Sequence, residues 1–548
     1  MQGLMQSYPL TLPPVFDRAE RLFADKKIVW GTATGRERTT LAEWADRTRR
    51  IGGVLEALGV PSDGRVGTFA WNTADHLALY WAVPGSGRVL HALNIRLFPD
   101  QVRYVVNHAE DDVIFVDRSL LGVFWPQAQT CATVRHLVVM DDGAATEIPD
   151  DPRVSRLQDL LEDAPPVRFD VTDENAAAAM CYTSGTTGNP KGVVYSHRSL
   201  YLHSLAALSA SGGIALSERD TVLPVVPMFH ANAWGFGQSP LFAGANLVLP
   251  GPQMQPDKIV AMLEEERVTF TAGVPTIWMS VLPYLDGRDL SALRTVLCGG
   301  SAVPKALSEA YKAKIGHPIL HAWGMTETSP IGSVNALPSA YDGLGEDELA
   351  DARARQGIPP VGVEARIVEP GTANELPWDD KATGELQVRG PWIAASYYRD
   401  DRSGESFTPD GWLRTGDVGA LDRFGNIRLV DRTKDLVKSG GEWISSVELE
   451  NHLMAHPAVA EAAVIGVPHP RWSERPLAAV VLKPGASASN DELIEFLRPR
   501  VAKWWLPDDV VFIDEVPKTS VGKFSKKDLR ARFIDYKLPT VDQSEGVP

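Results

Sequence analysis

One glycine- and hydroxyl-rich loop, YTSGTTGNPKG (residues 182–192), carries the strongest chemical signal in the sequence. It lies between two apolar runs, Ala176–Cys181 and Val193–Tyr195, so both of its flanks are predicted to be buried strands. Hydroxyl and backbone N–H groups donate hydrogen bonds to phosphate oxygens, glycine lets the backbone approach closely, and Lys191 adds a mobile positive charge. We therefore expect a hairpin-like loop over a triphosphate. A Walker A loop is not expected, because the lysine is followed by a strand-like segment instead of opening a helix.

A second polar cluster, WGMTET (residues 323–328), follows the apolar run Pro318–Ala322. Ligands collect where the strands of open α/β sheets end, which makes this cluster a candidate binding site. Trp323 could stack on a flat base, and the Glu327 carboxylate could hold a magnesium ion that bridges phosphates. The alternative interpretation of the cluster alone is a capped turn.

Three further segments are weaker signals when each is taken alone. In the segment WLRTGD, Asp417 could accept hydrogen bonds from both hydroxyls of a ribose, although Thr-Gly-Asp is also a common turn. His230 lies in an uncharged stretch, Thr221–Pro256, where Trp234 and several small residues suggest the mouth of an apolar slot. A histidine in such company is more often a core residue than a catalyst. Lys523 lies in a glycine-containing turn near the end of the chain, where a lysine is by default a surface charge.

The pattern around these clusters predicts a layered α/β architecture. From Pro13 to about Ile331, short apolar runs alternate with segments of helical period, which indicates largely parallel sheets. Strands are expected over Arg65–Ala70, Asp112–Val116, His136–Met140 and Asn246–Leu249. Helices are expected over Asp100–His108, His197–Ser209, Asp257–Glu266 and Pro304–Ala313.

From Gly357 the pattern changes to short strands separated by Gly, Pro and Asp turns, which predicts a β-rich, barrel-like subdomain. A charged segment that begins at Asp431 and runs towards paired glycines at 440–441 is a plausible hinge. Beyond it, helices and strands predict a small α+β lid. We therefore expect an N-terminal domain over residues 1–430, with α/β subdomains to about 355 and the β-rich subdomain over 356–430. A hinge over 431–436 and a mobile C-terminal lid domain over 437–548 follow.

Length and composition exclude several classes of protein. A chain of 548 residues is too long for one core, and a formal charge of −16 argues against a broad basic face for nucleic acid or anionic membranes. Cys131, Cys181 and Cys298 are far apart in apolar settings, which predicts reduced core cysteines of a cytoplasmic protein and no zinc site. No signal peptide is expected at the N-terminus, and prolines and polar residues in the uncharged stretch argue against an integral membrane segment.

Taken together, the five clusters closely resemble the adenylate-forming superfamily of acyl-CoA synthetases, firefly luciferases and peptide-synthetase adenylation domains. The resemblance covers the chain from about Pro13 to Lys523. It is strongest to bacterial medium- and long-chain fatty acyl-CoA synthetases, through the loop, VVPMFHANAW (225–234) and KSGGEWISS (438–446). It implies that a carboxylate displaces pyrophosphate from ATP with the help of magnesium, and that coenzyme A then attacks the acyl-adenylate.

The resemblance also implies a role for each cluster. The β- and γ-phosphates of ATP are held by Thr183, Ser184, Gly185, Thr186, Thr187 and Lys191. Adenine and the acyl group are bordered by Gly300, Ser301, Ala302, Trp323, Gly324 and Met325. The remaining nucleotide contacts are Thr326 to the α-phosphate, Asp417 to the ribose, and Arg432 to ribose or phosphate. The metal ligands are Thr183 and Glu327.

Further implied roles concern the acyl group, coenzyme A and the lid. The acyl pocket is formed by His230, Trp234, Gly299, Gly324, Pro330 and Ile331. The CoA channel includes Gly440, Gly441, Glu442 and Trp443. Lys523 stabilises the charge that develops during attack, alongside Thr183, Glu327 and His230 as catalytic residues, and Asp431 is the hinge. Two positions depart from the common pattern: Trp323 replaces the usual Tyr, and Trp443 replaces a smaller residue, although fatty acyl members carry it.

Three alternatives stay open at this stage. One is a ligase for short, functionalised acids such as methylthioalkanoates or aryl acids, and a second is an adenylation enzyme that loads a carrier protein. A third is a binding protein or an oxygenase on the same fold. Because the stretch Thr221–Pro256 holds no charge to pair with a charged tail, medium- to long-chain fatty acids are the expected substrates. The expected partners are small molecules, and homodimer formation is left open.

Overall fold

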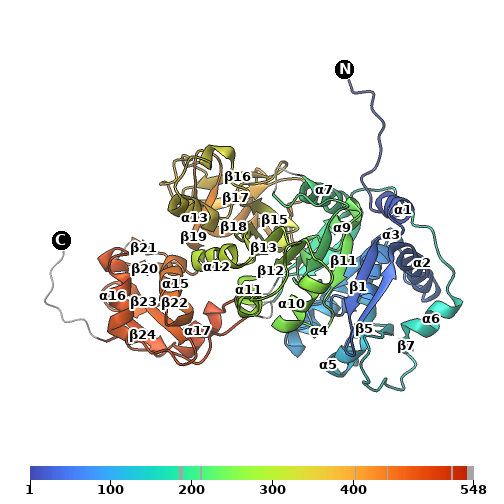
Figure 1. Cartoon of the computed structure of the whole chain (residues 1–548). Helices are drawn as coiled ribbons and strands as arrows, with labels where there is room; N and C mark the ends of the chain where they lie inside the picture. Colours follow the sequence, from blue (N-terminus) through green and yellow to red (C-terminus); the bar gives the residue numbers. More distant parts are fainter. Residues whose placement is uncertain (184–188, 210–212, 402, 441, 520–522, 540–548) are drawn as a thin grey trace.

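The computed structural model describes residues 1–183, 189–209, 213–401, 403–440, 442–519 and 523–539, with only the backbone of Glu442 (Figure 1). The predicted ligands Ser184, Gly185, Thr186, Thr187 and Gly441 lie outside the described residues. The described strands form sheets of seven, eight, four and five strands.

The seven-stranded sheet has the order β7-β6-β5-β3-β4-β8-β9, and all its pairs except the β8–β9 pair are parallel. Its strands are β3 (Arg65–Phe69), β4 (Val89–Ala92), β5 (Asp111–Asp117), β6 (His136–Met140), β7 (Val154–Arg156), β8 (Ala177–Tyr182) and β9 (Gly192–Ser196). The antiparallel β8–β9 pair frames the loop, so the predicted hairpin is confirmed.

The eight-stranded sheet has the order β15-β14-β13-β12-β10-β11-β1-β2, and only the edge strands β15 and β2 are antiparallel to their neighbours. Its strands are β1 (Lys27–Gly31), β2 (Arg36–Thr40), β10 (Thr221–Pro224), β11 (Asn246–Leu249), β12 (Phe270–Gly273), β13 (Thr295–Gly299), β14 (Leu320–Gly324) and β15 (Ile331–Val334). The carboxyl ends of β10, β12, β13 and β14 therefore share one edge of the sheet.

A common apolar core joins the two large sheets. It includes Val66 and Leu90 from the first sheet and Val222 and Leu247 from the second. Helix α3 (Ala74–Gly85) is buried on all sides within it, which explains why its sequence is apolar all round and lacks a polar face. The other helices of this region are α1 (Pro13–Leu22), α2 (Leu41–Ala57), α4 (Pro99–Ala109), α5 (Leu121–Ala128), α6 (Leu157–Asp163), α7 (His197–Leu208), α8 (Ala231–Trp234), α9 (Ser239–Ala243), α10 (Pro256–Glu265), α11 (Pro275–Val281), α12 (Lys305–Ile315) and α13 (Glu346–Ala354).

The β-rich segment forms a four-stranded antiparallel sheet whose edge strands are β16 and β19. The segment contains β16 (Glu364–Val368), β17 (Gly384–Arg389), helix α14 (Ser403–Ser406), β18 (Leu413–Leu421) and β19 (Ile427–Arg432). Trp323 of β14 packs into the apolar cluster of this sheet, so the end of the eight-stranded sheet and the β-rich segment share a core.

The C-terminal part lies to one side of the molecule, drawn in orange and red (Figure 1). Its strands are β20 (Val437–Ser439), β21 (Glu442–Ile444), β22 (Val459–His469), β23 (Ser473–Leu482) and β24 (Asp509–Phe512). Its helices are α15 (Ser446–Met454), α16 (Asn490–Leu497) and α17 (Lys526–Arg532). One apolar cluster holds residues of α15 and α16, such as Leu449 and Leu493, and a separate cluster holds Leu529 of α17, so this part has cores of its own.

The structure confirms the predicted mixed α/β class with a separate C-terminal part, and each strand and helix predicted N-terminal to Ile331 is present within a few residues. The predicted hinge differs in one respect, because β19 continues through Asp431 to Arg432 and these residues lie within the sheet. The three cysteines are buried and free, as predicted. Among the described residues, no helix combines the length and apolar character needed to cross a bilayer.

Candidate active site

The two stems of the glycine-rich loop are held together at its base. The backbone N–H of Thr183 donates to the Lys191 carbonyl (2.9 Å), and the Lys191 N–H donates to the Thr183 hydroxyl (3.1 Å). Beside this base, the Tyr398 N–H donates to the Gly192 carbonyl (2.8 Å). A side chain at Gly192 would meet the Tyr182 ring and the Tyr398 Cβ, which explains the glycine at the start of β9.

Glu327 lies in a short turn directly after β14 and is 5% exposed. Its Oε1 accepts a hydrogen bond from the Tyr397 hydroxyl at 2.6 Å. Its backbone carbonyl accepts from the Ala394 N–H at 2.8 Å, and the carbonyl of the preceding Thr326 accepts from the Tyr195 hydroxyl at 2.8 Å. The turn therefore has a fixed geometry, and it presents a buried carboxylate at the carboxyl edge of the sheet.

Asp417, on β18, lies beside the end of β14. Its Oδ2 accepts from the Trp323 indole N–H at 2.8 Å, and its Oδ1 accepts from the Arg432 guanidinium at 3.1 Å. The carboxylate raises the pKa of Arg432. The Trp323 ring packs against Gly332, where a Cβ would lie 2.3 Å from the ring. The sequence prediction that Trp323, Asp417 and Arg432 belong to one site is consistent with this arrangement.

The acyl-side residues gather where β13 ends. The Trp234 ring lies within 3.5–3.6 Å of the positions that a Cβ would take on Gly299 and Gly300. The Lys523 Cε lies 3.2 Å from the same point at Gly300, whose φ of +84° also favours glycine. Lys523 from the C-terminal part therefore reaches the edge of the eight-stranded sheet.

The backbone beneath Trp234 is unusual. Residues 231–234 all have positive φ, from +43° to +56°, and Gly235 follows at +79°. For Ala231, Ala233 and Trp234 this left-handed conformation is uncommon, because Cβ approaches the following carbonyl. The turn holds Trp234 against the two glycines at the end of β13.

Two titratable groups in this cleft have shifted pKa values. Burial and, to a smaller extent, repulsion from Lys523 lower the pKa of His230 to about 3, so the imidazole is neutral at pH 7. Burial and the Arg432 charge lower the pKa of Lys523 to about 8, while Asp417 and Glu327 oppose that shift. Lys523 is thus mostly protonated at pH 7 and faces the carboxylates of the site.

Asp431 links β19 to the C-terminal part. It is 4% exposed, and its Oδ2 accepts hydrogen bonds from the backbone N–H (2.7 Å) and the hydroxyl of Ser446, at the start of α15. Behind Ser446, Lys526 makes an ion pair with Glu450 at 2.7 Å. The residue predicted as the hinge therefore joins β19 to the start of α15.

The segment predicted to form the CoA channel lies elsewhere. Gly440 donates through its N–H to the Trp472 carbonyl (2.8 Å), and a side chain there would contact the Trp472 ring. The Trp443 ring is 42% exposed, with the Lys438 ammonium 5.6 Å from its centroid. Figure 1 draws β20 and β21 in the upper part of the orange-red C-terminal part, whereas β13 lies in the middle of the molecule.

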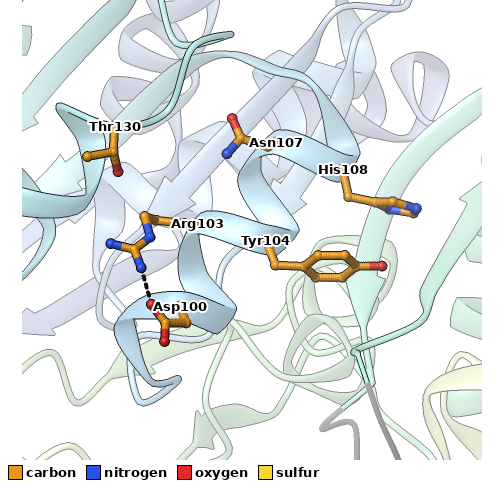
Figure 2. A pocket seen from close by; sticks show the side chains of 6 residues that line it. All are labelled: Asp100, Arg103, Tyr104, Asn107, His108 and Thr130. Atoms are coloured by element: carbon orange, nitrogen blue, oxygen red, sulfur yellow. Dashed lines mark hydrogen bonds and ion pairs between the residues drawn. The ribbon is translucent and has the colours of Figure 1, made fainter.

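Two surface hollows share Tyr104 and His108, and one of them reaches Pro190 and Lys191 at the end of the loop. One, of about 310 Å³, is lined by Tyr104, His108, Pro190, Lys191, Tyr398, Arg399, Asp400 and Asp401. The other, of about 590 Å³, is lined by Asp100, Arg103, Tyr104, Asn107, His108 and Thr130 (Figure 2). In Figure 2 Asp100 pairs with Arg103 along α4, and Tyr104 and His108, stacked at 5.3 Å, extend to the same side. Neither hollow contains Glu327, Asp417 or Lys523, so neither is the predicted substrate site.

These contacts bring the predicted residues into three groups. Thr183 and Lys191 connect to Glu327 through Tyr397. Trp323 and Arg432 bind Asp417, and Trp234 and Lys523 meet beside Gly299 and Gly300. Sequence reasoning missed Tyr397, whose ring lies 4.4 Å below the Lys191 ammonium and whose hydroxyl binds Glu327. Tyr397 and Tyr398 precede Arg399 in a turn of the β-rich segment. Nothing in this local sequence predicts that Tyr397 contacts Lys191 and Glu327.

Known proteins resemble this chain in both sequence and structure. A model of the family described as AMP-binding enzyme matches residues 16–398, and one of the AMP-binding enzyme C-terminal domain matches residues 448–523. The chain is 46% identical over 537 residues, 97% of each chain, to a long-chain-fatty-acid–CoA ligase of Thermus thermophilus. It is 42% identical over 542 residues, 98% of this chain and 99% of the relative, to a 3-methylmercaptopropionyl-CoA ligase of Ruegeria lacuscaerulensis. The crystal structure of ATP-bound MatB from Rhodopseudomonas palustris matches with a TM-score of 0.82 and 29% identity, over 96% of this chain and 100% of that one.

Proposed function

The chain belongs to the AMP-binding enzyme family, and from that membership we propose that it is an ATP-dependent fatty acid–CoA ligase. In the first step, a carboxylate oxygen attacks the α-phosphorus of ATP, forming an acyl-adenylate and releasing pyrophosphate. In the second, the sulfur of coenzyme A attacks the acyl carbon, forming the thioester and releasing AMP. The observation that carries the proposal is the position of Lys523, in the cleft beside Gly300 and within electrostatic reach of Asp417 and Glu327.

ATP fits the charges of the cleft. The loop that begins at Thr183 and ends at Lys191 would bind the β- and γ-phosphates, and the Asp417 carboxylate would accept from the ribose hydroxyls. Asp417 keeps acceptor capacity for this, since each of its oxygens accepts one hydrogen bond from the described part of the chain. The Trp323 ring, Gly324 and the Gly300–Ala302 turn would border the adenine, with Thr326 at the α-phosphate.

A magnesium ion fits the same cleft. Glu327 offers a buried carboxylate with Oε1 bonded to Tyr397, and Thr183 offers a hydroxyl at the foot of the loop. Magnesium is usually held by one or two protein oxygens together with phosphates and water, so these two residues suffice. When bound, the ion would neutralise phosphate charge.

Lys523 would stabilise the charge that builds on the α-phosphate during attack. The geometry favours this role because the ammonium is desolvated yet mostly protonated at pH 7, and a fixed charge in a poorly hydrated site costs no reorganisation during the reaction. His230, neutral in the same cleft, would border the reacting carboxylate as a hydrogen-bonding group and not as a cation.

The second step needs a different arrangement of the C-terminal part. Lys523 occupies the space beside Gly300, whereas Gly440 lies against the Trp472 ring and β20 and β21 are drawn apart from β13 (Figure 1). We propose a domain boundary with a hinge at Asp431, between a body over residues 1–430 and a lid over 437–548. Rotation there would withdraw Lys523 and bring the glycine-rich β20–β21 turn and the exposed Trp443 ring towards coenzyme A.

The acyl group would enter past Trp234 into the uncharged stretch. Its residues Val222, Val226, Met228 and Phe236 belong to the common core, so an apolar chain meets no unpaired charge there. This supports medium- to long-chain acids, as in the name of the Thermus thermophilus relative.

One observation favours a second candidate, a ligase for short functionalised acids such as 3-methylmercaptopropionate. Asn232 and Gln238 are each 1% exposed, and the Asn232 Nδ2 and both polar atoms of Gln238 lack a hydrogen-bond partner within the described part of the chain. Buried amide groups of this kind in the wall would suit a polar or sulfur-containing tail. The Ruegeria lacuscaerulensis relative supports the same candidate.

A panel of carboxylic acids separates the candidates. We expect AMP release to require both the acid and coenzyme A. When coenzyme A is omitted, we expect an exchange of pyrophosphate into ATP that depends on the carboxylic acid. A rise in kcat/KM from propionate to dodecanoate supports the fatty acid assignment, and a maximum at 3-methylmercaptopropionate supports the second candidate. Absence of pyrophosphate exchange with every acid would contradict both.

A further inference from the structure

Tyr397 contacts two opposite charges of the cleft with one ring. Its hydroxyl donates to Glu327 Oε1 at 2.6 Å, and the Lys191 ammonium lies 4.4 Å from the ring centroid. Tyr397 is 9% exposed and Glu327 is 5% exposed, so bulk water screens these contacts weakly. Lys191, Glu327 and Tyr397 are far apart in the sequence, and the fold brings the three side chains together.

The backbone around Tyr397 is fixed from both sides. The segment 392–398 begins with Trp392, whose carbonyl accepts from the Ser329 hydroxyl at 2.7 Å. Ala394 then binds the Glu327 carbonyl, and Tyr398 binds the Gly192 carbonyl, one residue after Lys191. The segment thus ties the Glu327 turn to the foot of the glycine-rich loop, and Tyr397 lies between the two attachment points.

This placement has an electrostatic consequence. A lysine and a glutamate in a poorly solvated cleft attract each other strongly, and a direct pair would neutralise both. Among the described residues no ion pair joins Lys191 to Glu327. Instead the ammonium faces the negative π surface of the ring, and the carboxylate binds the positive end of the hydroxyl dipole.

We propose that Tyr397 is a positioning residue that keeps Lys191 and Glu327 from pairing with each other, so that the lysine stays available to phosphate oxygens and the carboxylate to a divalent cation. This inference rests on the proposed binding of ATP. The ring and the hydroxyl of Tyr397 have separate roles. The ring separates and holds the lysine, and the hydroxyl orients the carboxylate.

Equilibrium binding of ATP, measured by titration calorimetry in EDTA and again at rising Mg²⁺, tests the two parts. Tyr397→Phe keeps the ring, so metal-free ATP affinity should stay within about twofold of the parent, because the cation–π contact survives. The Mg²⁺ concentration that half-maximally strengthens ATP binding should rise about tenfold, as for loss of a group that orients a metal ligand.

Tyr397→Leu removes the ring and lets Lys191 reach Glu327. Metal-free ATP affinity should then fall about tenfold, the scale of a desolvated charge contact. Adding Glu327→Gln to Tyr397→Leu removes the competing carboxylate and should restore most of that affinity. Glu327→Gln in the parent chain is the reference for this comparison, because it also removes the repulsion between the carboxylate and metal-free ATP, and the recovery in the double variant must exceed the gain seen there. Recovery of this kind would not follow from a merely structural role of the tyrosine.

The neighbouring Tyr398→Phe is the matched control, because the Tyr398 ring contacts His108 and Arg399. It should behave as the parent in both titrations. Equal loss of metal-free affinity in Tyr397→Phe and Tyr397→Leu, or no recovery with Glu327→Gln, would overturn the inference. Should Tyr397→Leu fail to fold, an unchanged Mg²⁺ midpoint in Tyr397→Phe would overturn it. A parent chain that binds no ATP would instead contradict the proposed function itself.

Discussion

The Trp323 indole N–H donates to Asp417 Oδ2 across 2.8 Å, joining the end of β14 to β18 of the four-stranded sheet. The two residues are 94 positions apart. The tyrosine that is common in the resembling family at this position would bring a phenol instead of an indole. In this chain the aromatic group proposed to border adenine also orients the carboxylate proposed to bind the ribose.

Trp323→Phe should therefore weaken ATP binding while leaving the aromatic face in place. Loss of a hydrogen bond to a charged acceptor predicts a rise of about tenfold in the KM for ATP, with the KM for the acid nearly unchanged. Steady-state kinetics with ATP and acid varied separately measure both. Trp392→Phe is the control, since the Trp392 indole donates to the Ile331 carbonyl (2.9 Å) within the same apolar cluster. Equal effects of the two substitutions would assign the loss to packing.

Lys523→Ala should separate the two half-reactions. Removal of one preorganised charge at the transition state predicts adenylation slower by about 10²–10³. Thioester formation from pre-made acyl-adenylate should be nearly unaffected, because Lys523 must leave the cleft for that step. Pyrophosphate exchange reports the first half-reaction, and CoA-dependent AMP release from added acyl-adenylate reports the second. Equal slowing of both would mean that Lys523 serves both steps or is structural.

The lowered pKa of Lys523, about 8, predicts an alkaline limit on adenylation. The charged form is the active one, so the adenylation rate should fall as the pH rises through that value. At lower pH the lysine is charged, and its titration should not reduce the rate. Lys523→Arg stays charged over the whole range, and it should remove the alkaline limb whatever its own maximum rate. The measurement is the pH profile of pyrophosphate exchange between pH 6 and about 10, with the second half-reaction as the internal control. An alkaline limb that persists in Lys523→Arg would place its origin in another group.

Several features of this site follow from local sequence, and others do not. The loop, the strand His136–Met140 and the cluster after β14 are predictable, because hydrophobic period and glycine placement are local properties. Tyr397 is not, since its partners Lys191 and Glu327 come from other sheets.

Asp431 shows a different limit. Its position in a charged run predicts a hinge, yet it lies buried within β19, where Ser446 satisfies its carboxylate. The left-handed turn at Ala231–Trp234 is also not predictable from the local sequence, because alanine seldom adopts positive φ.

Asp431→Ala should loosen the position of the C-terminal part that places Lys523 in the cleft. It removes the acceptor for the Ser446 N–H, a hydrogen bond to a charged group, while the backbone of β19 stays intact. Adenylation should slow about tenfold, and thioester formation should slow less or quicken. Glu364→Ala is the control, an exposed partner of Arg389 on the same sheet. Unchanged adenylation in Asp431→Ala would show that other contacts hold the C-terminal part.

Trp234→Ala should change which acids are used, because the Trp234 ring covers Gly299 and Gly300 at the end of β13. An apolar channel contributes about 0.8 kcal/mol per buried CH₂, so kcat/KM in the parent should rise with chain length until the channel ends. Removal of the ring widens the entrance and should move the optimum to longer or branched acids, with kcat/KM for ATP nearly constant. The measurement is kcat/KM for acids from propionate to hexadecanoate in both proteins. A parent that uses propionate derivatives as well as dodecanoate would have a short or plugged pocket, and a Trp234→Ala profile identical to the parent's would place the entrance elsewhere.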